Sequence, residues 1–397
     1  MKPFPARCRA AAIDLLLAVG VNAPASAATL TVTSRLDAGP GTLRQAVADA
    51  HSGDTINFDF TWPAGIGITN APLYITKNLN IVGPGADKLT IEGNLPDNPL
   101  LQNHFSSTVT ISGVRIRHGG AGAIYIPGGA LTLRDCAIVD NLGHAIIVSG
   151  SLTVDNCVFS GNQALDRSPS DFGGAIRTVT GTATISNSTF DSNESDDGCG
   201  AVFNGGDAMT IRNSTFSNNK TFGNNISQGG ALCSPGALTV ESSTFSGNYA
   251  RGPGGAIRAG NGTLTGLTFK DNFSPQGSNS IYGGAGLVVR RSILENCNAQ
   301  LGSGGDNIAG DASCFAASAE LNDRVGLDPR LGELADNGGP TKTIALRAGS
   351  PAVDQVIVNA AGCAGTDQRG LPRPGGPRCD VGAVERDGDL LFDDRFE

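Results

Sequence analysis

Two histidines and two aspartates in one part of the chain are of the types that serve as catalytic acids and bases. They are His118, Asp135, Asp140 and His144. A histidine and a carboxylate within hydrogen-bonding reach of a substrate can exchange a proton with it during bond cleavage. However, His118 lies in an ordinary turn, and His144 stands where related repeats carry glycine. This group is therefore only an alternative candidate for a catalytic site.

Cleavage of a polysaccharide by hydrolysis needs two carboxylates held at a fixed distance on a rigid face. The outward residues that follow successive apolar runs do not supply such a pair. In chain order they are Ser112, Arg134, Asp155, Ser186, Arg212, Glu241, Thr265 and Arg290. Carboxylates alternate with arginines, which is typical of a solvated, charge-balanced face. The sequence also lacks a Ser-His-Asp arrangement, a phosphate loop and a dinucleotide fingerprint, and it favours a protein without catalytic activity.

Metal binding has little support in the sequence. The histidines are scattered and no Cys-x-x-Cys pair occurs, so a zinc site is not expected. Acidic stretches at residues 191–197 and in the C-terminal tail could bind calcium weakly and structurally, although neither matches a twelve-residue calcium loop. We therefore predict no cofactor.

One sequence motif recurs along the chain and indicates how these residues are positioned. A Gly-Gly-Ala-Ile type of motif at residues 173–176, 229–232 and 254–257 is followed each time by a short polar and apolar run. When the repeats are aligned, one isoleucine or phenylalanine recurs in each of them, roughly 21 to 31 residues after the one before, which is the spacing of a solenoid. They are Ile138, Phe159, Phe190, Phe216, Phe245 and Phe269.

Each repeat contains runs such as Leu-Thr-Val, in which apolar and polar residues alternate as in a strand with one buried face. No helix of ten residues fits between the runs, so the strands are not joined by helical crossovers. We therefore predict an all-β protein: a single-stranded right-handed parallel β-helix like that of pectate lyases, with about 4.8 Å of rise per coil. A short amphipathic helix at residues 42–51 would cover the N-terminal end, where strand edges are unpaired.

An asparagine follows the aligned apolar residue by three positions in six repeats. The six are Asn141, Asn162, Asn193, Asn219, Asn248 and Asn272. An amide at a corner can donate a hydrogen bond to the same amide one coil away, at about 1 kcal/mol net per bond. The sequence therefore predicts an asparagine ladder.

Composition limits the classes of partner. A solenoid grows without a single central core, so the 397 residues can form one elongated domain. The formal net charge of −9 argues against nucleic acid and against anionic membrane surfaces. No segment after the N-terminus is long and apolar enough to span a membrane, and we expect a monomer.

The first 27 residues resemble a secretory signal peptide. Lys2, Arg7 and Arg9 precede an apolar segment, and a small-residue motif predicts cleavage between Ala27 and Ala28. We therefore expect an exported protein, at the cell surface or outside the cell.

Export places the remaining eight cysteines in an oxidising compartment, where disulfides form. Two pairs bracket short irregular stretches and are the favoured disulfides: Cys363 with Cys379, and then Cys297 with Cys314. Cys136 and Cys157 occupy the same position in adjacent coils. A strained bridge and a stack of buried thiols both remain open for that pair.

The chain divides into five parts on this interpretation. They are a signal peptide (1–27), an N-terminal cap of strand and helix (28–60), the β-helix (61–320), a final irregular coil with a C-terminal cap (321–386) and an acidic tail (387–397).

The repeats at residues 173–193 resemble those of chlamydial polymorphic outer membrane proteins. A larger part of the chain is similar to secreted bacterial β-helix proteins of the "choice-of-anchor Q" type. The similar stretches are residues 42–47, 53–56, 337–343, 349–354, 367–370 and 379–385. The resemblance implies a right-handed β-helix and extracellular or surface placement, but no particular activity.

A rigid rod with corner loops of varied length suits recognition, since loops on rigid scaffolds commonly carry binding sites. We therefore expect a binding or adhesion module for an extracellular glycan or for a surface protein of a host or neighbouring cell. A polysaccharide lyase or glycoside hydrolase, and a purely structural envelope protein, are the alternatives.

Overall fold

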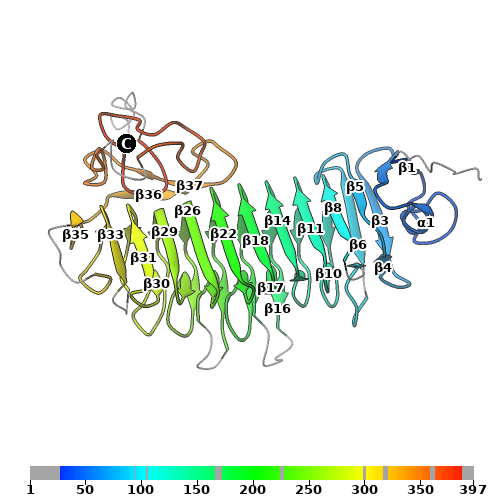
Figure 1. Cartoon of the computed structure of the whole chain (residues 1–397), viewed down its shortest axis with the longest axis horizontal. Coiled ribbons are helices and arrows are strands. Elements are labelled where there is room, and N and C mark those ends of the chain that lie inside the picture. The colour runs from blue at the N-terminus through cyan, green and yellow to red at the C-terminus, as the bar shows by residue number, and fades with distance from the viewer. Residues whose placement is uncertain are drawn as a thin grey trace, which may run out of the picture.

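Short strands separated by glycine and asparagine form the coils of a long rod in the computed structural model of the chain (Figure 1). The structure describes residues 27–93, 95–103, 106–165, 172–223, 228–297, 301–315, 321–357 and 363–386. The predicted signal peptide up to residue 26 and the acidic tail therefore lie outside the described residues. The predicted fold class, a right-handed parallel β-helix with one short helix, is confirmed.

The described strands form three parallel sheets along the rod and one hairpin. The large sheet contains β1 (Thr29–Val32), β2 (Thr55–Phe58), β3 (Ala64–Ile68), β5 (Leu79–Val82), β6 (Leu89–Gly93), β8 (Thr108–Ser112), β9 (Arg115–Arg117), β11 (Ala130–Arg134), β12 (Ala137–Val139), β14 (Ser151–Asp155), β15 (Val158–Ser160), β18 (Thr182–Ser186), β19 (Thr189–Asp191), β22 (Ala208–Arg212), β23 (Thr215–Ser217), β26 (Ala237–Ser246), β29 (Gly262–Lys270), β31 (Leu287–Arg290), β32 (Ile293–Leu294), β33 (Gly302–Gly305), β34 (Ile308–Ala309) and β35 (Arg324–Val325). The nine-stranded sheet contains β4 (Leu73–Ile75), β7 (Leu101–Asn103), β10 (Ile124–Ile126), β13 (Ile146–Ser149), β17 (Ile176–Thr180), β21 (Val202–Asn204), β25 (Leu232–Ser234), β28 (Ile257–Ala259) and β30 (Ile281–Tyr282). The four-stranded sheet contains β16 (Gln163–Ala164), β20 (Glu194–Ser195), β24 (Lys220–Thr221) and β27 (Tyr249–Ala250), and the hairpin pairs β36 (Leu331–Ala335) with β37 (Thr343–Leu346).

Equivalent residues of successive coils stack inside the rod. The five rings from Phe159 to Phe269 are fully buried, with neighbouring centroids 4.7 to 5.1 Å apart. The predicted asparagines also stack: each amide from Asn141 to Asn248 donates to the next coil's amide oxygen at 2.8 to 2.9 Å. Every coil therefore places the same side chain where the preceding coil can contact it, and the polar amides remain bonded although they are buried.

In the large sheet each coil turns at a residue in the left-handed backbone conformation, which lies between two strands or, at Ser242 and Gly266, within one long strand. Along the rod this corner row holds Gly113, Asp135, Asn156, Asn187, Asn213, Ser242, Gly266, Arg291 and Asp306, with φ between +43° and +63°. Glycine, asparagine and aspartate tolerate this conformation best, so the row explains why these residues punctuate the repeats.

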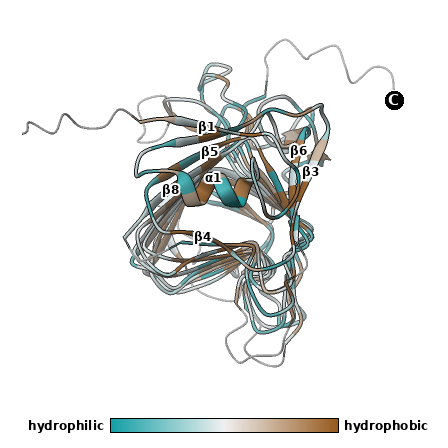
Figure 2. Cartoon of the chain, turned by 90° about the vertical axis from the view of Figure 1, so that its right-hand side faces the viewer, coloured by the Kyte–Doolittle hydropathy of each residue, from teal (hydrophilic) through white to brown (hydrophobic). Residues whose placement is uncertain are grey.

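The helix covers the N-terminal end of the rod, as expected (Figure 2). It is α1 (Leu43–Asp49), slightly shorter than the predicted segment, and the Thr42 hydroxyl accepts the Gln45 N–H at 3.2 Å. Its buried face packs on the first coils. Both β1 and β2 pair in the large sheet, so the ladder of strands begins within the segment that we had assigned to the cap.

The C-terminal segment is placed differently from the predicted cap. After β35 the chain turns back, and residues 336–357 and 363–386, the C-terminal segment, lie along the flank of the last coils rather than across the open end (Figure 1). The buried Gln368 side chain fixes this placement: its amide donates to the Thr215 hydroxyl at 2.8 Å, and its oxygen accepts from the Thr244 hydroxyl at 2.6 Å. These polar partners lie on the outer surface of the coils, which is why the segment docks there.

Candidate functional site

Three of the four residues of the alternative catalytic group have contacts outside the group. His118 lies 3.8 Å from the Glu92 carboxylate, and Asp135 accepts from the Asn156 amide at 2.6 Å. His144 is half-buried, with Nδ1 3.2 Å from the Gly173 carbonyl oxygen. His118, Asp135 and Asp140 are exposed and have positive φ angles of 53° to 59°. They are corner residues of the coil.

The outward row of charged residues aligns as the sequence indicated. Arg134, Asp155 and Ser186 occupy successive rungs of the large sheet. Further along, Arg212 and Glu241 are neighbours and form an ion pair of 2.7 Å. The carboxylates on this face are therefore held by cations and hydroxyls rather than by one another.

The acidic stretch after Asp191 forms no cation cage in the structure. Asp191 accepts from the Ser217 hydroxyl at 2.6 Å and from the Asn218 amide at 3.0 Å. Within the described ranges, no three His, Cys, Asp or Glu side chains gather to hold a metal ion.

Three disulfides tie described parts of the chain. The two favoured pairs, Cys297–Cys314 and Cys363–Cys379, are both bonded in the structure. The third, Cys199–Cys233, was not predicted from the sequence, because its residues are 34 positions apart in neighbouring coils.

Cys136 and Cys157 are free, buried thiols. The Cys136 N–H points at the Cys157 sulfur at 3.4 Å, and the Cys157 N–H donates to the Ser188 hydroxyl at 3.1 Å. The Ser188 N–H donates in turn to Ser214 at 3.2 Å. The two thiols thus occupy a row that serine fills elsewhere, and of the two interpretations left open the structure has the stack of thiols.

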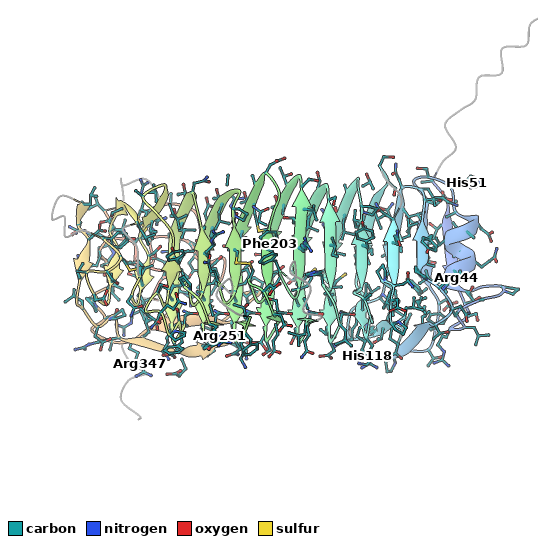
Figure 3. The ribbon with its side chains drawn as sticks, turned by 90° about the horizontal axis from the view of Figure 1, so that it is seen from below. Arg44, His51, His118, Phe203, Arg251 and Arg347 are labelled. Carbon is teal, nitrogen blue, oxygen red and sulfur yellow. A yellow bond between two sulfur atoms is a disulfide. The ribbon has the colours of Figure 1, made fainter. Side chains whose placement is uncertain are left out.

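An outward row of aromatic side chains runs along the nine-stranded sheet and was missed in the sequence. One line of paired positions across this sheet contains four aromatic residues: Tyr74, Tyr125, Phe203 and Tyr282. The strands between them carry other residues at the same position, among them Arg177 and Arg258. We call these four residues the aromatic row. Tyr74 is 56% exposed, and the other three are half-buried. Figure 3 views the side on which these strands lie and labels Phe203 there. Each residue directly follows the aligned aliphatic residue of its repeat, a signal that was present in the sequence.

A second aromatic group lies at the corner beside the four-stranded sheet. Phe222, Tyr249 and Phe273 place their rings 5.9 and 6.0 Å apart on three successive coils. Phe222 and Phe273 are 43% and 52% exposed. We call these three residues the corner stack.

A hollow of about 410 Å³ lies beside β29 and β32, and Glu295 and Lys270 are among its lining residues. The Glu295 carboxylate accepts the Asn272 N–H at 3.1 Å and so ends the asparagine ladder. Burial raises the pKa of Glu295 to about 7, and repulsion by Asp271 acts in the same direction. A carboxyl with such a pKa can donate a proton near neutral pH. A second hollow lies between the corner row and the C-terminal segment.

These features define a β-solenoid stabilised by stacked side chains and presenting aromatic and charged outer faces. The chain belongs to the right-handed β-helix family: the family model described as "right handed beta helix region" matches residues 100–273 and 174–321, which together span more than half of the chain. No curated protein matches the sequence.

Among solved structures, pectate lyase Pel9A is similar, with a TM-score of 0.51 and 14% identity over 91% of this chain and 97% of that one. ORF18 of Geobacillus virus E2 matches with a TM-score of 0.48 and 12% identity over 75% of this chain. The chain spans only 60% of the length of that phage protein. At such identities the likeness to pectate lyase shows the fold alone.

Proposed function

We propose that the protein is an exported binding module that holds an extended glycan chain along the aromatic row. The observation that carries this proposal is the alignment of four outward aromatic side chains on one face of a rigid sheet. A sugar ring has apolar C–H faces that pack on aromatic rings, while its hydroxyls keep hydrogen bonds to polar neighbours and water. Because coils repeat about every 4.8 Å, a straight polymer can contact several of these rings at once.

Export is part of the proposal. Three disulfides agree with an oxidising compartment. Among the described residues, no helix has both the length and the apolar character needed to cross a membrane. A surface protein of a neighbouring or host cell would be a partner through the glycans that it carries.

The test is retention of the full-length mature chain on a panel of neutral and acidic polysaccharides, with and without calcium. The double variant Tyr125→Ala/Phe203→Ala should lose roughly tenfold or more in affinity, since each ring is worth about 1 kcal/mol or more. The control is Phe222→Ala/Phe273→Ala, which removes two aromatic rings, both more exposed, from the corner stack. If the control loses binding and the first variant keeps it, the aromatic row is not the site.

Cleavage of the glycan is the second candidate function, and Glu295 in its hollow is the observation that favours it. The same incubations should then release unsaturated products or new reducing ends, and Glu295→Gln should abolish them. Retention without cleavage supports the binding module. Neither retention nor cleavage on any glycan would favour a structural envelope protein.

A further inference from the structure

The corner row contains one residue that does not suit its position. Glycine, asparagine, aspartate and serine fill the row in the other coils, but Arg291 stands there with φ of +48°. A long side chain in the left-handed conformation is uncommon and costs free energy. Such a residue is often retained because the side chain itself is needed.

The Arg291 side chain is buried without a partner. The residue is only 6% exposed, and its buried Nε and Nη1 groups donate to no hydrogen-bond acceptor. Burial, together with the nearby cations Arg373 and Arg290, lowers the pKa of Arg291 to about 10. The guanidinium is therefore still charged at neutral pH. A buried, unpaired charge of this kind is unfavourable unless a counter-ion completes it.

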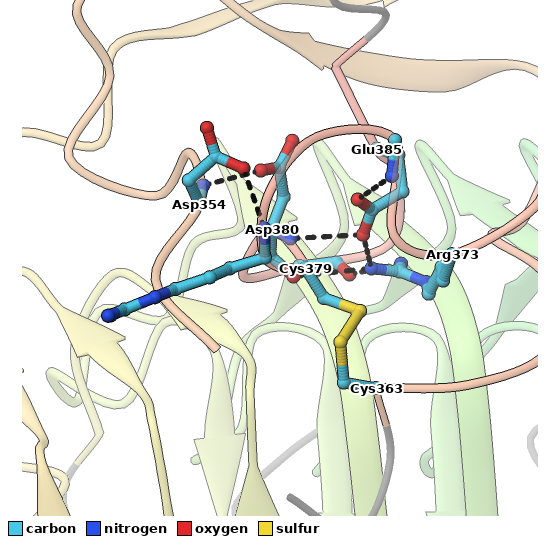
Figure 4. The surroundings of a disulfide bond; sticks show 9 residues. Asp354, Cys363, Arg373, Cys379, Asp380 and Glu385 are labelled. Atoms are coloured by element: carbon cyan, nitrogen blue, oxygen red, sulfur yellow. Dashed lines mark hydrogen bonds and ion pairs between the residues drawn. A yellow bond between two sulfur atoms is a disulfide. The ribbon is translucent and has the colours of Figure 1, made fainter. Parts of the chain in front are cut away.

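Glu241 and Glu385 do not supply that counter-ion, because each is already paired with another arginine. Glu241 pairs with Arg212 at 2.7 Å. Glu385 pairs with Arg373, whose guanidinium also donates to the Gly382 carbonyl at 2.7 Å (Figure 4). Each of these pairs is neutral, so the positive charge of Arg291 remains.

Arg291 lines a hollow of about 350 Å³ between the corner row and the C-terminal segment. Most of the other lining side chains are polar and can donate hydrogen bonds. The donors are Arg212, Asn213, Ser242, Thr265, Thr366 and Arg373, and the one carboxylate in the lining is Glu241, which accepts from Arg212. The Gly382 N–H donates to the Arg291 carbonyl at 2.9 Å, and residues 364–366 directly follow Cys363 of the Cys363–Cys379 disulfide. The C-terminal segment thus covers Arg291, and the hydrogen bond from Gly382 and the disulfide at Cys363 hold it there.

We propose that this hollow is a binding site for an oxyanion, with Arg291 as its principal ligand. The planar guanidinium suits the oxygens of a carboxylate, sulfate or phosphate group, which it can bind with two parallel hydrogen bonds. The hydroxyls of Ser242, Thr265 and Thr366 would complete the shell of donors. Two sources offer this chemistry: a free inorganic anion, and an acidic sugar such as a uronate. The site is independent of the glycan-binding function proposed above and lies on a different sheet.

The test is calorimetric titration of the full-length mature protein with sulfate, phosphate, glucuronate and glucose, each in chloride buffer at constant ionic strength. We expect one site per chain for at least one oxyanion, and none for glucose. Arg291→Met should weaken that affinity at least about tenfold, because hydrogen bonds to charged groups are the strong ones. Arg291→Lys should weaken it less, since it keeps the charge but not the planar fork.

The matched control is Arg258→Met, which removes an outward arginine from β28 in the nine-stranded sheet. It should leave oxyanion binding unchanged. Binding of glucuronate but not of sulfate or phosphate assigns the site to an acidic sugar, and the reverse assigns it to a free ion; both support the proposal. If the wild-type protein binds no oxyanion, or if Arg291→Met binds as tightly as the wild type, the proposal is wrong.

Thermal unfolding gives a second measurement. In chloride buffer Arg291→Met should be at least as stable as the wild type, because it removes an unpaired buried charge and keeps much of the apolar packing. Sulfate or glucuronate should raise the unfolding temperature of the wild type and not that of the variant. A variant that is less stable in chloride and still stabilised by oxyanions would show that Arg291 has only a structural role.

Discussion

The regular coils and the C-terminal segment bury polar groups in different ways. In the coils a buried polar side chain can be satisfied by its own counterpart one turn away, as in the asparagine ladder from Asn141 to Asn272. Between Asp336 and Arg386 each contact occurs once: Gln368 reaches the Thr215 and Thr244 hydroxyls, and Arg373 pairs with Glu385. A repeated contact can be found from the spacing of residues alone, whereas a contact that occurs once cannot.

The difference also concerns stability. The coils depend on stacked apolar side chains, each of which contacts two others of its kind. The C-terminal segment has a small apolar cluster around Val356 and Val381, together with a disulfide and buried charges. We therefore expect changes in the coils to affect the whole rod, and changes in the segment to act locally.

The largest effect should come from the phenylalanine stack. Phe216 is fully buried, with ring centroids 4.7 and 4.9 Å from its neighbours. Phe216→Ala should lower the free energy of unfolding by about 3–5 kcal/mol, measured by denaturant titration. Phe273→Ala, at a position 52% exposed, should cost much less. Equal losses would mean that the stack does not dominate the stability of the coils.

Loss of the Cys363–Cys379 disulfide should have the next largest effect. A bridge that closes a loop of about 15 residues contributes roughly 3 kcal/mol in the chain-entropy model. In Cys363→Ser/Cys379→Ser, amide exchange should increase within residues 363–386 and stay unchanged in β14 to β23. Faster exchange in the coils as well would show that the two regions unfold as one unit.

Gln368→Ala should release the C-terminal segment at lower cost. Its removal leaves the buried Thr244 hydroxyl without the oxygen to which it donates, at about 1–3 kcal/mol. Limited proteolysis after residue 336 measures the effect. The exposed Gln45→Ala on α1 is the control and should change stability by no more than about 0.5 kcal/mol.

The smallest effect is a dependence on pH that differs between the two regions. Burial raises the pKa of Glu295 to about 7 in the coils, and it raises the pKa of Asp380 to about 6 in the C-terminal segment. The folded protein then holds these protons more tightly than the unfolded chain, so the contribution of these two groups to stability is greatest below their unfolded pKa values and falls as pH rises towards each folded pKa.

For Glu295 the loss should be about 1–2 kcal/mol between pH 4.5 and 7, allowing for solvent screening. Glu295→Gln should reduce this dependence of the free energy of global unfolding on pH. Asp380→Asn should flatten only the pH dependence of amide exchange in the C-terminal segment, between about pH 4 and pH 6. If either variant keeps the pH dependence of the wild type, that dependence does not arise from the residue replaced.

Much of the coil could be predicted from the sequence because each coil repeats its neighbour. Once Phe190 aligns with Phe216, the parallel register places every other residue of both coils, including Asn193 over Asn219. The aromatic row follows from the same alignment, since Tyr125 and Phe203 stand at equivalent positions after the aligned aliphatic residues. The sequence analysis did not predict this row, because it selected candidates by acid–base chemistry, and that criterion led to His118 and Asp140, which are corner residues.

The sequence by itself thus determined the β-helix, its stacked core, its asparagine ladder and two of its disulfides, because these depend on local patterns and on near-identical neighbours. Only the tertiary structure decided where the C-terminal segment lies and what surrounds Arg291. Gln368 is separated from Thr215 by 153 residues, and nothing in the repeats specifies that contact. The hollow at Arg291 exists only where two unrelated stretches of chain meet, so its chemistry depends on docking and not on periodicity.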